Sequence, residues 1–149
     1  MGYTTVFTGR IKIEPPLDEK EIEFLRKFNA TRRMNRTKGP YYVDAGGVAG
    51  QAHEADVVDH NRPPEGQPGL WCQWTPTDDG AFIEWDGVEK FYEAEEWMTY
   101  IIEHFIKPDA IAKASLPFLR GHNCNGDAEA QGEESDDRWK LVVKDNKVT

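Results

Sequence analysis

Cysteine is scarce in this sequence, and long apolar runs are missing from it. The 149 residues include 2 cysteines, Cys72 and Cys124. A pair so far apart is more typical of small buried side chains than of a disulfide in a reducing compartment. No apolar run approaches the roughly 20 residues that cross a bilayer, and the N-terminal MGYTTVFTGR lacks the basic and apolar segments of a secretory signal. We therefore expect a cytoplasmic protein that does not enter a membrane.

Positive charge is also in short supply. Aspartate and glutamate number 27 against 18 lysines and arginines, which gives a net charge of −9. Binding to nucleic acid through its phosphates needs a basic surface that displaces counterions, so a nucleic-acid partner is not expected. Hydrophobic residues make up 38% of the chain and aromatic residues 11%, which is enough for one domain with its own core.

The motifs that mark common enzymes are absent as well. The sequence contains no P-loop, no dinucleotide-binding glycine motif and no G-x-S-x-G elbow. Glu84 and Asp86 are close in sequence, as are the acids of segment 133–137, and neighbouring carboxylates can act as acid and base. Asp86, however, has a simpler role as a helix cap. We assign no catalytic residue and expect a binding protein rather than an enzyme.

Residue types that bind zinc are present, but not at the spacing of a zinc site. His122 and Cys124 are near neighbours, with Cys72 as a distant third candidate. A second group consists of His53, Asp56 and His60. Structural zinc sites use four ligands, often in C-x-x-C pairs, and neither that motif nor H-E-x-x-H occurs. We therefore expect no metal and no cofactor.

Hydrophobic periodicity predicts strands and helices over most of the chain. The expected strands cover 2–13, 70–76, 81–85, 123–132 and 138–145, with a further short one at 41–43, and the expected helices cover 17–33 and 88–107. Capping boxes support both helix starts, Asp18 with Glu21 and Asp86 with Glu89. Gly80 suits the turn between the strands at 70–76 and 81–85.

This order predicts a single α+β domain over residues 1–149. The first six main elements follow the split βαβ order of a ferredoxin-like sandwich (β-α-β-β-α-β), with an extra C-terminal strand. We expect an antiparallel sheet with two helices on one face. The segment at about 44–68 is a polar insertion rich in glycine and proline, and its composition permits it to be flexible.

Tryptophan is concentrated in one stretch, PGLWCQWTPTDDGAFIEWDGVEKFYEAEEW, residues 68–97. In a strand, Trp71 and Gln73 would face one side of the sheet, and Cys72 and Trp74 the other. Cys72 and Trp74 are then expected in the core with Phe82 or Ile83. Trp71 and Gln73 would lie on an open aromatic face of the sheet, which could anchor a protein partner or stack a base.

A basic segment follows the first predicted helix in this acidic chain. It contains Arg26, Lys27, Arg32, Arg33, Arg36 and Lys38. These side chains could hold a phosphate or an acidic partner, or they could simply complement the dipole at the helix C-terminus. We take Arg32, Arg33 and Arg36 as candidate ligand- or partner-binding residues beside Trp71 and Gln73.

Several segments carry a resemblance to other proteins. GYTTVFTGRI, QPGLWCQW, IEWDGVEKFYEAEEWMTYII and AQGEESDDRWKLVVKDNKV resemble a group of small hypothetical proteins of actinobacteria and their bacteriophages, over most of the chain except 44–66. GLWCQW followed by EWDGVEKFY is the most specific part. More loosely, the pattern is similar to the ferredoxin-like domain of YubB-type proteins. The resemblance implies the fold and a phage or mobile-element origin, and carries no active-site residues.

These observations favour a non-enzymatic interaction module, encoded by a phage or mobile element, that engages a host or phage macromolecule in the host cytoplasm. One alternative is a small-ligand or nucleotide binder that uses the aromatic face and the three arginines. Another is a divergent enzyme or metalloprotein in which His122, Cys124 and an acid converge. A homodimer through the sheet edge or its open face is a further hypothesis.

Overall fold

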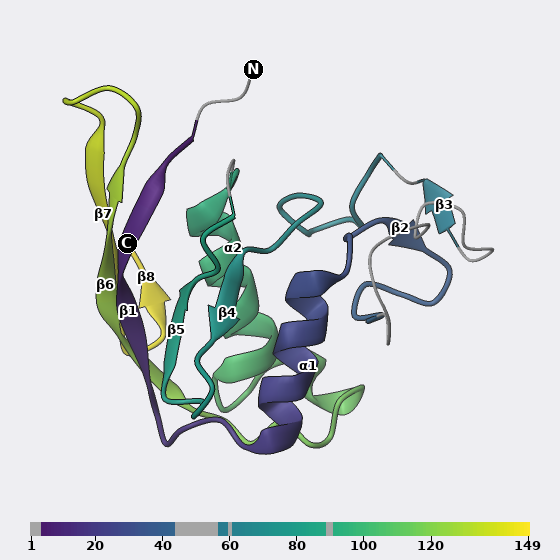
Figure 1. Ribbon diagram of the computed structural model, residues 1–149. Coiled ribbons are helices and arrows are strands. Elements are labelled where there is room, and N and C mark those ends of the chain that lie inside the picture. The colour runs from purple at the N-terminus through teal and green to yellow at the C-terminus, as the bar shows by residue number, and fades with distance from the viewer. Residues whose placement is uncertain (1–3, 44–56, 60, 89–90) are drawn as a thin grey trace.

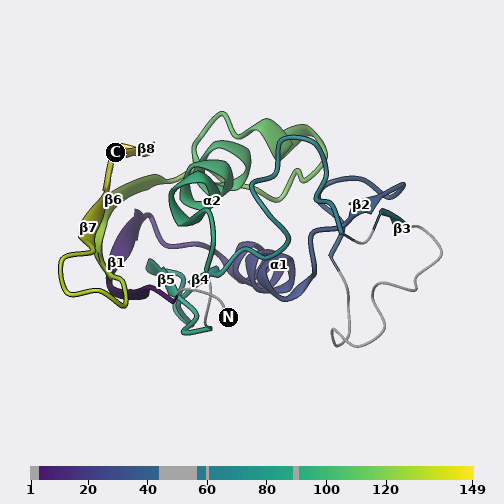
Figure 2. The ribbon, with the colours of Figure 1, turned by 90° about the horizontal axis from the view of Figure 1, so that it is seen from above.

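The chain folds around one antiparallel sheet with two helices packed on the same face. The computed structural model describes residues 4–43, 57–59, 61–88 and 91–149. The six-stranded sheet has the order β4-β5-β1-β6-β7-β8, and β2 pairs with β3 in a separate small sheet. Figures 1 and 2 show α1 and α2 together on one side of the large sheet. The expected α+β class, with an antiparallel sheet and helices on one face, is confirmed.

The bounds of the elements follow the hydrophobic pattern closely in most places. The strands are β1 Val6–Glu14, β2 Asn35–Arg36, β3 Val57–Asp59, β4 Trp74–Pro76, β5 Phe82–Trp85, β6 Asn123–Gln131, β7 Arg138–Lys144 and β8 Lys147–Val148. The helices are α1 Glu19–Ala30, α2 Ala94–Ile101, the π-helical turn η2 Ile102–Ile106 and the 3₁₀ turn η3 Ile111–Ala114. Residues 41–43, which the structure describes, form no strand, contrary to the prediction.

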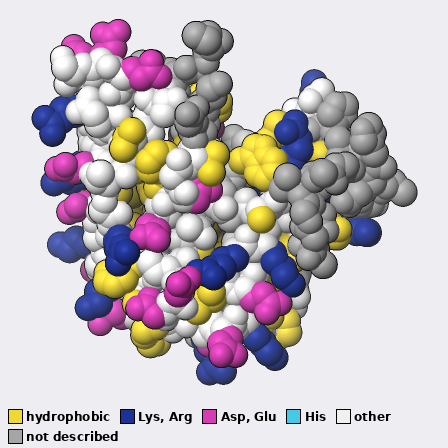
Figure 3. All heavy atoms as spheres, viewed as in Figure 1, with side chains coloured by type: hydrophobic (Ala, Val, Ile, Leu, Met, Phe, Trp, Pro, Cys, Tyr) yellow, Lys and Arg dark blue, Asp and Glu magenta, His cyan; other side chains and the backbone are white. Residues whose placement is uncertain are grey.

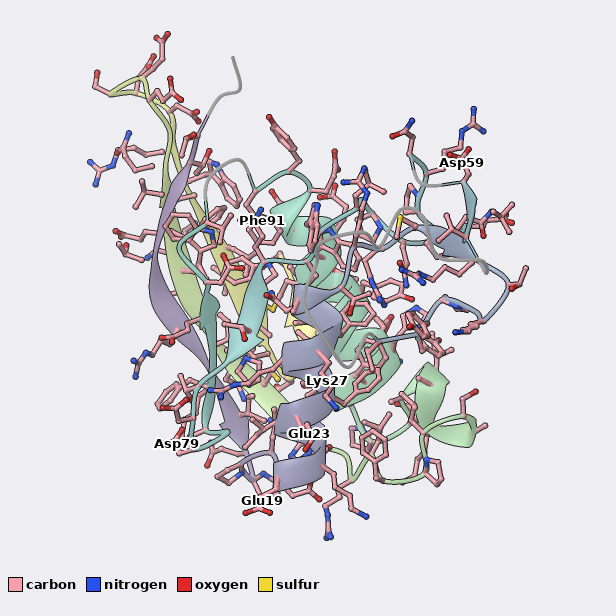
Figure 4. All side chains as sticks on the ribbon, turned by 45° about the vertical axis from the view of Figure 1, so that its right-hand side comes forward. Glu19, Glu23, Lys27, Asp59, Asp79 and Phe91 are labelled. Carbon is pink, nitrogen blue, oxygen red and sulfur yellow. The ribbon has the colours of Figure 1, made fainter. Side chains whose placement is uncertain are left out.

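The start of α1 is formed by the capping box that the sequence predicts. The Asp18 carboxylate accepts a hydrogen bond from the Glu21 amide at 2.9 Å, and Glu21 Oε1 accepts one from the Asp18 amide at 3.1 Å. Glu23 and Lys27 form an ion pair one turn apart on the outward face of this helix (Figure 4). The helix ends at Ala30, before the predicted residue 33.

The second helix begins later than predicted, and Asp86 does not cap it. α2 begins after Glu93, whose φ is 61°, whereas Asp86 accepts from the Val88 amide at 2.9 Å in a local turn. Gly87 has a φ of 84°, which is incompatible with a helix that starts there. Glu89, the predicted capping-box partner of Asp86, lies outside the described residues. The described residues before α2, 86–88 and 91–93, are therefore not helical; they lie at the upper end of the sandwich, where Figure 4 labels Phe91.

The core lies between the helices and the inward face of the sheet. Fully buried side chains of β1, β5 and β7 meet those of α1, α2 and η2; they include Ile11, Ile13, Ile83, Leu141, Phe28, Trp97 and Phe105. Cys72 and Trp74 belong to this core, as predicted. Gly80, in the turn before β5, has a positive φ of 72°.

The outward face of the sheet is polar rather than aromatic in the described part of the chain. Its exposed side chains are Val6, Thr8, Arg10, Lys12, Glu14, Asn123, Asp127, Glu129, Arg138, Lys140 and Lys144, of which only Val6 is apolar. Opposite charges face each other across strands, as in Arg10 with Asp127 and Glu129 with Lys140. The expected open aromatic face does not form there, and the argument for a dimer through that face is removed.

Part of the predicted insertion is ordered against the rest of the molecule. We call residues 31–43, 57–59 and 61–66 the β2–β3 lobe, which lies beyond the end of α1 (Figure 1). Gln67, next to it, is buried and donates from Nε2 to the Pro40 carbonyl at 2.7 Å and to the Tyr100 hydroxyl at 3.0 Å. Residues 44–56 and 60 lie outside the described residues, so the flexibility of the insertion stays a prediction.

None of the helices in the described ranges is long and apolar enough to cross a bilayer.

Candidate functional site

A deep cleft opens at the end of the sandwich where α1 ends and α2 begins. Its volume is about 870 Å³. It is lined by segment 68–73, by Asn29 and Ala30 at the end of α1, and by Asp86, Val88, Tyr92 and Glu93 of the loop before α2. Figure 3 shows the molecule hollowed at this end, between the sandwich and the β2–β3 lobe. Clefts of this size typically hold ligands or partner side chains.

The walls of the cleft are mainly aromatic and aliphatic. Leu70, Trp71, Val88 and Tyr92 line it, and the last two are 56% and 58% exposed. Exposed apolar side chains are unremarkable when scattered, but a group of them around a hollow marks an interaction site. The cleft therefore offers an apolar surface that a bound group would cover.

Trp71 reaches the cleft because its segment does not join the sheet. The Arg33 amide donates to the Leu70 carbonyl at 2.6 Å, and Asn29 Nδ2 donates to the Cys72 carbonyl at 2.5 Å and to the Trp74 carbonyl at 3.2 Å. These bonds tie segment 70–73 to the end of α1, so β4 begins only at Trp74. The prediction of a strand from residue 70, with Trp71 on a sheet face, was therefore wrong; Trp71 is half-buried in the wall of the cleft.

Gln73 and Cys72 form part of the buried floor of the cleft. The Gln73 side-chain oxygen accepts from the indole nitrogen of Trp85 at 3.3 Å, which holds the amide in place. Burial raises the pKa of the Cys72 thiol to about 12, so the thiol stays protonated at neutral pH and is a poor nucleophile. The floor supports binding and offers no activated cysteine.

The charged groups at the cleft are carboxylates. Asp86 and Glu93 line it, and its described lining contains no lysine or arginine. Asp86 is exposed as a whole, but its carboxyl is partly desolvated, and this raises its pKa. Hydrogen bonds from the Val88 amide and from Asn29 lower the pKa, but they do not outweigh the effect of burial. A cleft with this lining favours cationic or neutral apolar groups and repels anions.

The structure places Arg33 in a structural role away from the cleft lining. Arg33 is 2% exposed, and its guanidinium donates to the carbonyls of Thr31, Pro40 and Tyr42 while lying 4.2 Å from the ring centroid of Phe28. Burial lowers its pKa to about 10, which still leaves it charged at neutral pH. These contacts tie the β2–β3 lobe to α1.

The other two candidate arginines also belong to the β2–β3 lobe. Arg36 is buried with its guanidinium 4.4 Å from the ring centroid of Tyr42, and Arg32 is half-buried. Of the five predicted site residues, Trp71 and Gln73 meet at the cleft, whereas the arginines are outside its described lining. A binding role for the arginines stays a prediction.

Sequence reasoning missed Asp86, Val88 and Tyr92 as site residues. Asp86 was interpreted as a helix cap, and the other two as parts of an amphipathic helix. The sequence signal that could have indicated a non-helical segment is Gly87, whose positive φ interrupts a helix at that position. Outside a helix, the apolar side chains of Val88 and Tyr92 need another place to pack, and both line the cleft.

His122 is engaged in a buried ion pair rather than in a metal site. Its Nδ1 donates to the Pro15 carbonyl at 2.6 Å, and its Nε2 donates to Glu21 Oε2 at 2.8 Å. Burial alone would lower the pKa of His122, but the hydrogen bonds to Glu21 and Pro15 outweigh it and raise the pKa. Because both partners are acceptors, the protonated ring donates from both nitrogens.

The described residues contain no group of three or more histidine, cysteine, aspartate or glutamate side chains arranged to hold a metal ion. Cys124 is buried, and burial raises its pKa to about 12. The other candidate group, His53, Asp56 and His60, lies outside the described residues.

Comparison with known proteins adds no further information: no family model, curated protein or solved structure matches the chain. The fold and the cleft define the class as an α+β protein with a six-stranded antiparallel sheet and an apolar cleft edged by carboxylates.

Proposed function

We propose that this chain is a non-enzymatic binding protein that engages a partner macromolecule through the cleft. The observation that carries the proposal is a hollow of about 870 Å³ with Trp71, Val88 and Tyr92 in its wall. Aromatic side chains in pockets are the usual anchors of protein interfaces. Asn29 and Ala30 at the end of α1 line one side of the cleft, and Tyr92 and Glu93, just before α2, line the other.

We also propose an origin and a setting for this activity. The resemblance of GLWCQW and EWDGVEKFY to small proteins of actinobacteria and their phages supports a phage or mobile-element accessory protein. Such a protein would act in the cytoplasm of the host cell, on a host or phage protein.

We propose further that the fold is ferredoxin-like. The support is the strand order β4-β5-β1-β6, in which β1 and β5 are neighbours although α1 and β4 separate them in the sequence. α1 follows β1 and α2 follows β5, as in the split βαβ pattern. β7 and β8 then extend the sheet beyond β6.

The nucleotide-binding alternative has less support than protein binding. A nucleotide phosphate would meet Asp86 and Glu93 at the cleft, while Arg33 already donates to backbone carbonyls. The divergent-enzyme alternative also has less support. The thiols of Cys72 and Cys124 have raised pKa values, and both nitrogens of His122 already form hydrogen bonds.

The test is affinity capture with matched variants. Tagged wild-type protein, Trp71→Ala, Tyr92→Ala and the control Val6→Ala are incubated with host lysate, and bound proteins and small molecules are identified by mass spectrometry. Val6 is 48% exposed and lies on β1, away from the cleft lining. We expect a protein that is retained by wild type and Val6→Ala and lost from both cleft variants. A co-purifying nucleotide would favour the alternative, and equal capture by all four proteins would contradict the proposal.

A further inference from the structure

We infer that the partner presents a basic peptide segment, with a lysine or arginine side chain seated in the cleft. This inference rests on the proposed function, because it names the kind of group that the cleft holds. Three features support it: the charges along α2, the aromatic walls of the cleft and an unsatisfied hydrogen-bond donor beside Gly69.

A second hollow, also lined by carboxylates, shares one lining residue with the cleft. This hollow has a volume of about 510 Å³, and Pro68 is the residue in common. Glu95, Glu96 and Glu103 of α2 and η2 line it. Glu103 pairs with Lys107 at 2.7 Å, whereas Glu95 and Glu96 form no ion pair with any described residue. Burial lowers the pKa of His104 in its wall, so that ring adds no positive charge at neutral pH.

The two hollows together match an extended segment rather than a single small cation. Glu93 just before α2, Glu96 in α2 and Glu103 in η2 run from the cleft to the far hollow. At a helical rise of about 1.5 Å per residue the track is roughly 15 Å long, the length of about four or five extended residues. A peptide along this track would place basic side chains at intervals against carboxylates.

The aromatic walls suit the aliphatic stem and the charged end of such a side chain. Trp71 and Tyr92 line the cleft together with Asp86. A lysine or arginine packs its methylene groups on apolar walls, gains a cation–π contact with the rings and pairs with the carboxylate. An anionic group would gain none of these contacts except the apolar one.

A buried donor beside the cleft suits the backbone of a peptide. Trp97 Nε1 is buried and has no hydrogen-bond acceptor among the described residues, which is uncommon for an indole nitrogen. An added Cβ on Gly69, in the cleft wall, would lie 3.6 Å from this nitrogen. A peptide carbonyl that approached over Gly69 would supply the acceptor that the indole N–H lacks.

The experiment compares peptides that differ only in charge. Three pools of capped hexapeptides, random in alanine, leucine, phenylalanine and serine, carry lysine, glutamine or glutamate at the remaining positions. Each pool is titrated into uniformly ¹⁵N-labelled protein, and amide shifts at Leu70, Trp71, Tyr92 and Glu95 are followed. We expect the lysine pool to shift these amides and to weaken with added salt, and the glutamate pool to leave them unchanged.

Variants separate the contribution of the cleft carboxylates to peptide binding from that of the Trp97 indole N–H. Asp86→Asn combined with Glu93→Gln should weaken binding of the lysine pool by about tenfold, and Gly69→Ala should weaken it to a similar extent by filling the approach to Trp97. Glu129→Gln, which removes the same kind of charge from the outward sheet face, should leave binding unchanged. Unperturbed amide spectra outside the cleft confirm that each variant is folded.

The outcomes separate this inference from the proposed function. Equal binding of the lysine and glutamine pools, unaffected by the carboxylate variants, overturns the inference and leaves a cleft that binds partners through apolar contacts. Failure of the lysine pool to shift the cleft amides also overturns it. The proposed function is tested separately, and it fails if the lysate capture finds no partner that depends on Trp71 and Tyr92.

Discussion

At the residue scale, the buried pair of His122 and Glu21 joins distant parts of the chain. Glu21 lies in the first turn of α1, and His122 precedes β6; both are almost fully buried. Glu21 Oε2 also accepts from the Arg120 amide at 3.2 Å, so the carboxylate that closes the capping box also anchors segment 120–122. Removing one partner of such a pair leaves a buried charge without compensation.

We predict that this pair stabilises the protein most strongly at the lower end of the neutral range. His122 has a folded-state pKa above its ordinary value of 6.5. Its contribution is therefore fully present below about pH 6.5 and is lost as the pH rises through the folded-state pKa. His122→Gln should lower the free energy of unfolding by about 3 kcal/mol near pH 6, and by less at higher pH.

Urea unfolding of wild type and His122→Gln across pH 6 to 9 measures this difference. His104→Gln is the matched control, because burial lowers the pKa of His104. The stability linked to the His104 titration is lost as the pH falls, which is the opposite sign. A His122→Gln effect that stays constant over the range would contradict the charged pair.

At the element scale, β1 and β6 approach each other closely at glycines. The two strands pair from Val6 with Gln131 to Glu14 with Asn123. A Cβ on Gly126, whose φ is +150°, would lie 2.7 Å from the Arg10 carbonyl oxygen. Because backbone atoms cannot move aside as a flexible side chain does, this position requires glycine.

Gly126→Ala should therefore lower the free energy of unfolding by about 2 kcal/mol or more. Gly39→Ala serves as the control, since Gly39 also has a positive φ, +100°, but an added Cβ there would have no described atom within 4 Å. Its smaller loss measures the cost of the backbone conformation alone. Equal losses for the two variants, by chemical denaturation, would show that the close approach to Arg10 costs nothing.

At the scale of the whole molecule, the surface argues against self-association through the sheet. The outward face carries exposed charges of both signs, and the edge strands β4 and β8 are only 3 and 2 residues long. Short edges offer few unpaired backbone groups to a second copy. We predict a monomer of 17.0 kDa by light scattering, up to high protein concentration. A stable dimer mass would restore the homodimer hypothesis.

Local patterns in the sequence account for most of the elements. Alternation in β1, β6 and β7, the capping box of Asp18 and Glu21, and the turn at Gly80 all depend on residues close together in the chain. Each of these signals is set by nearest-neighbour geometry, so the sequence determines it without knowledge of the fold. The α+β class and the helices on one face follow from the order of such elements.

The cleft and the roles of its residues depend on contacts that the sequence does not display. Trp71 leaves the sheet because Arg33 and Asn29 hold its segment against α1, and Arg33 is a structural residue because distant carbonyls surround it. Both outcomes depend on hydrogen bonds and burial between segments far apart in the chain, and tertiary packing of this kind overrides local propensity. The sequence alone determined most of the elements and the acidity of the protein, and only the tertiary structure decided where β4 and α2 begin and which side chains meet around the cleft.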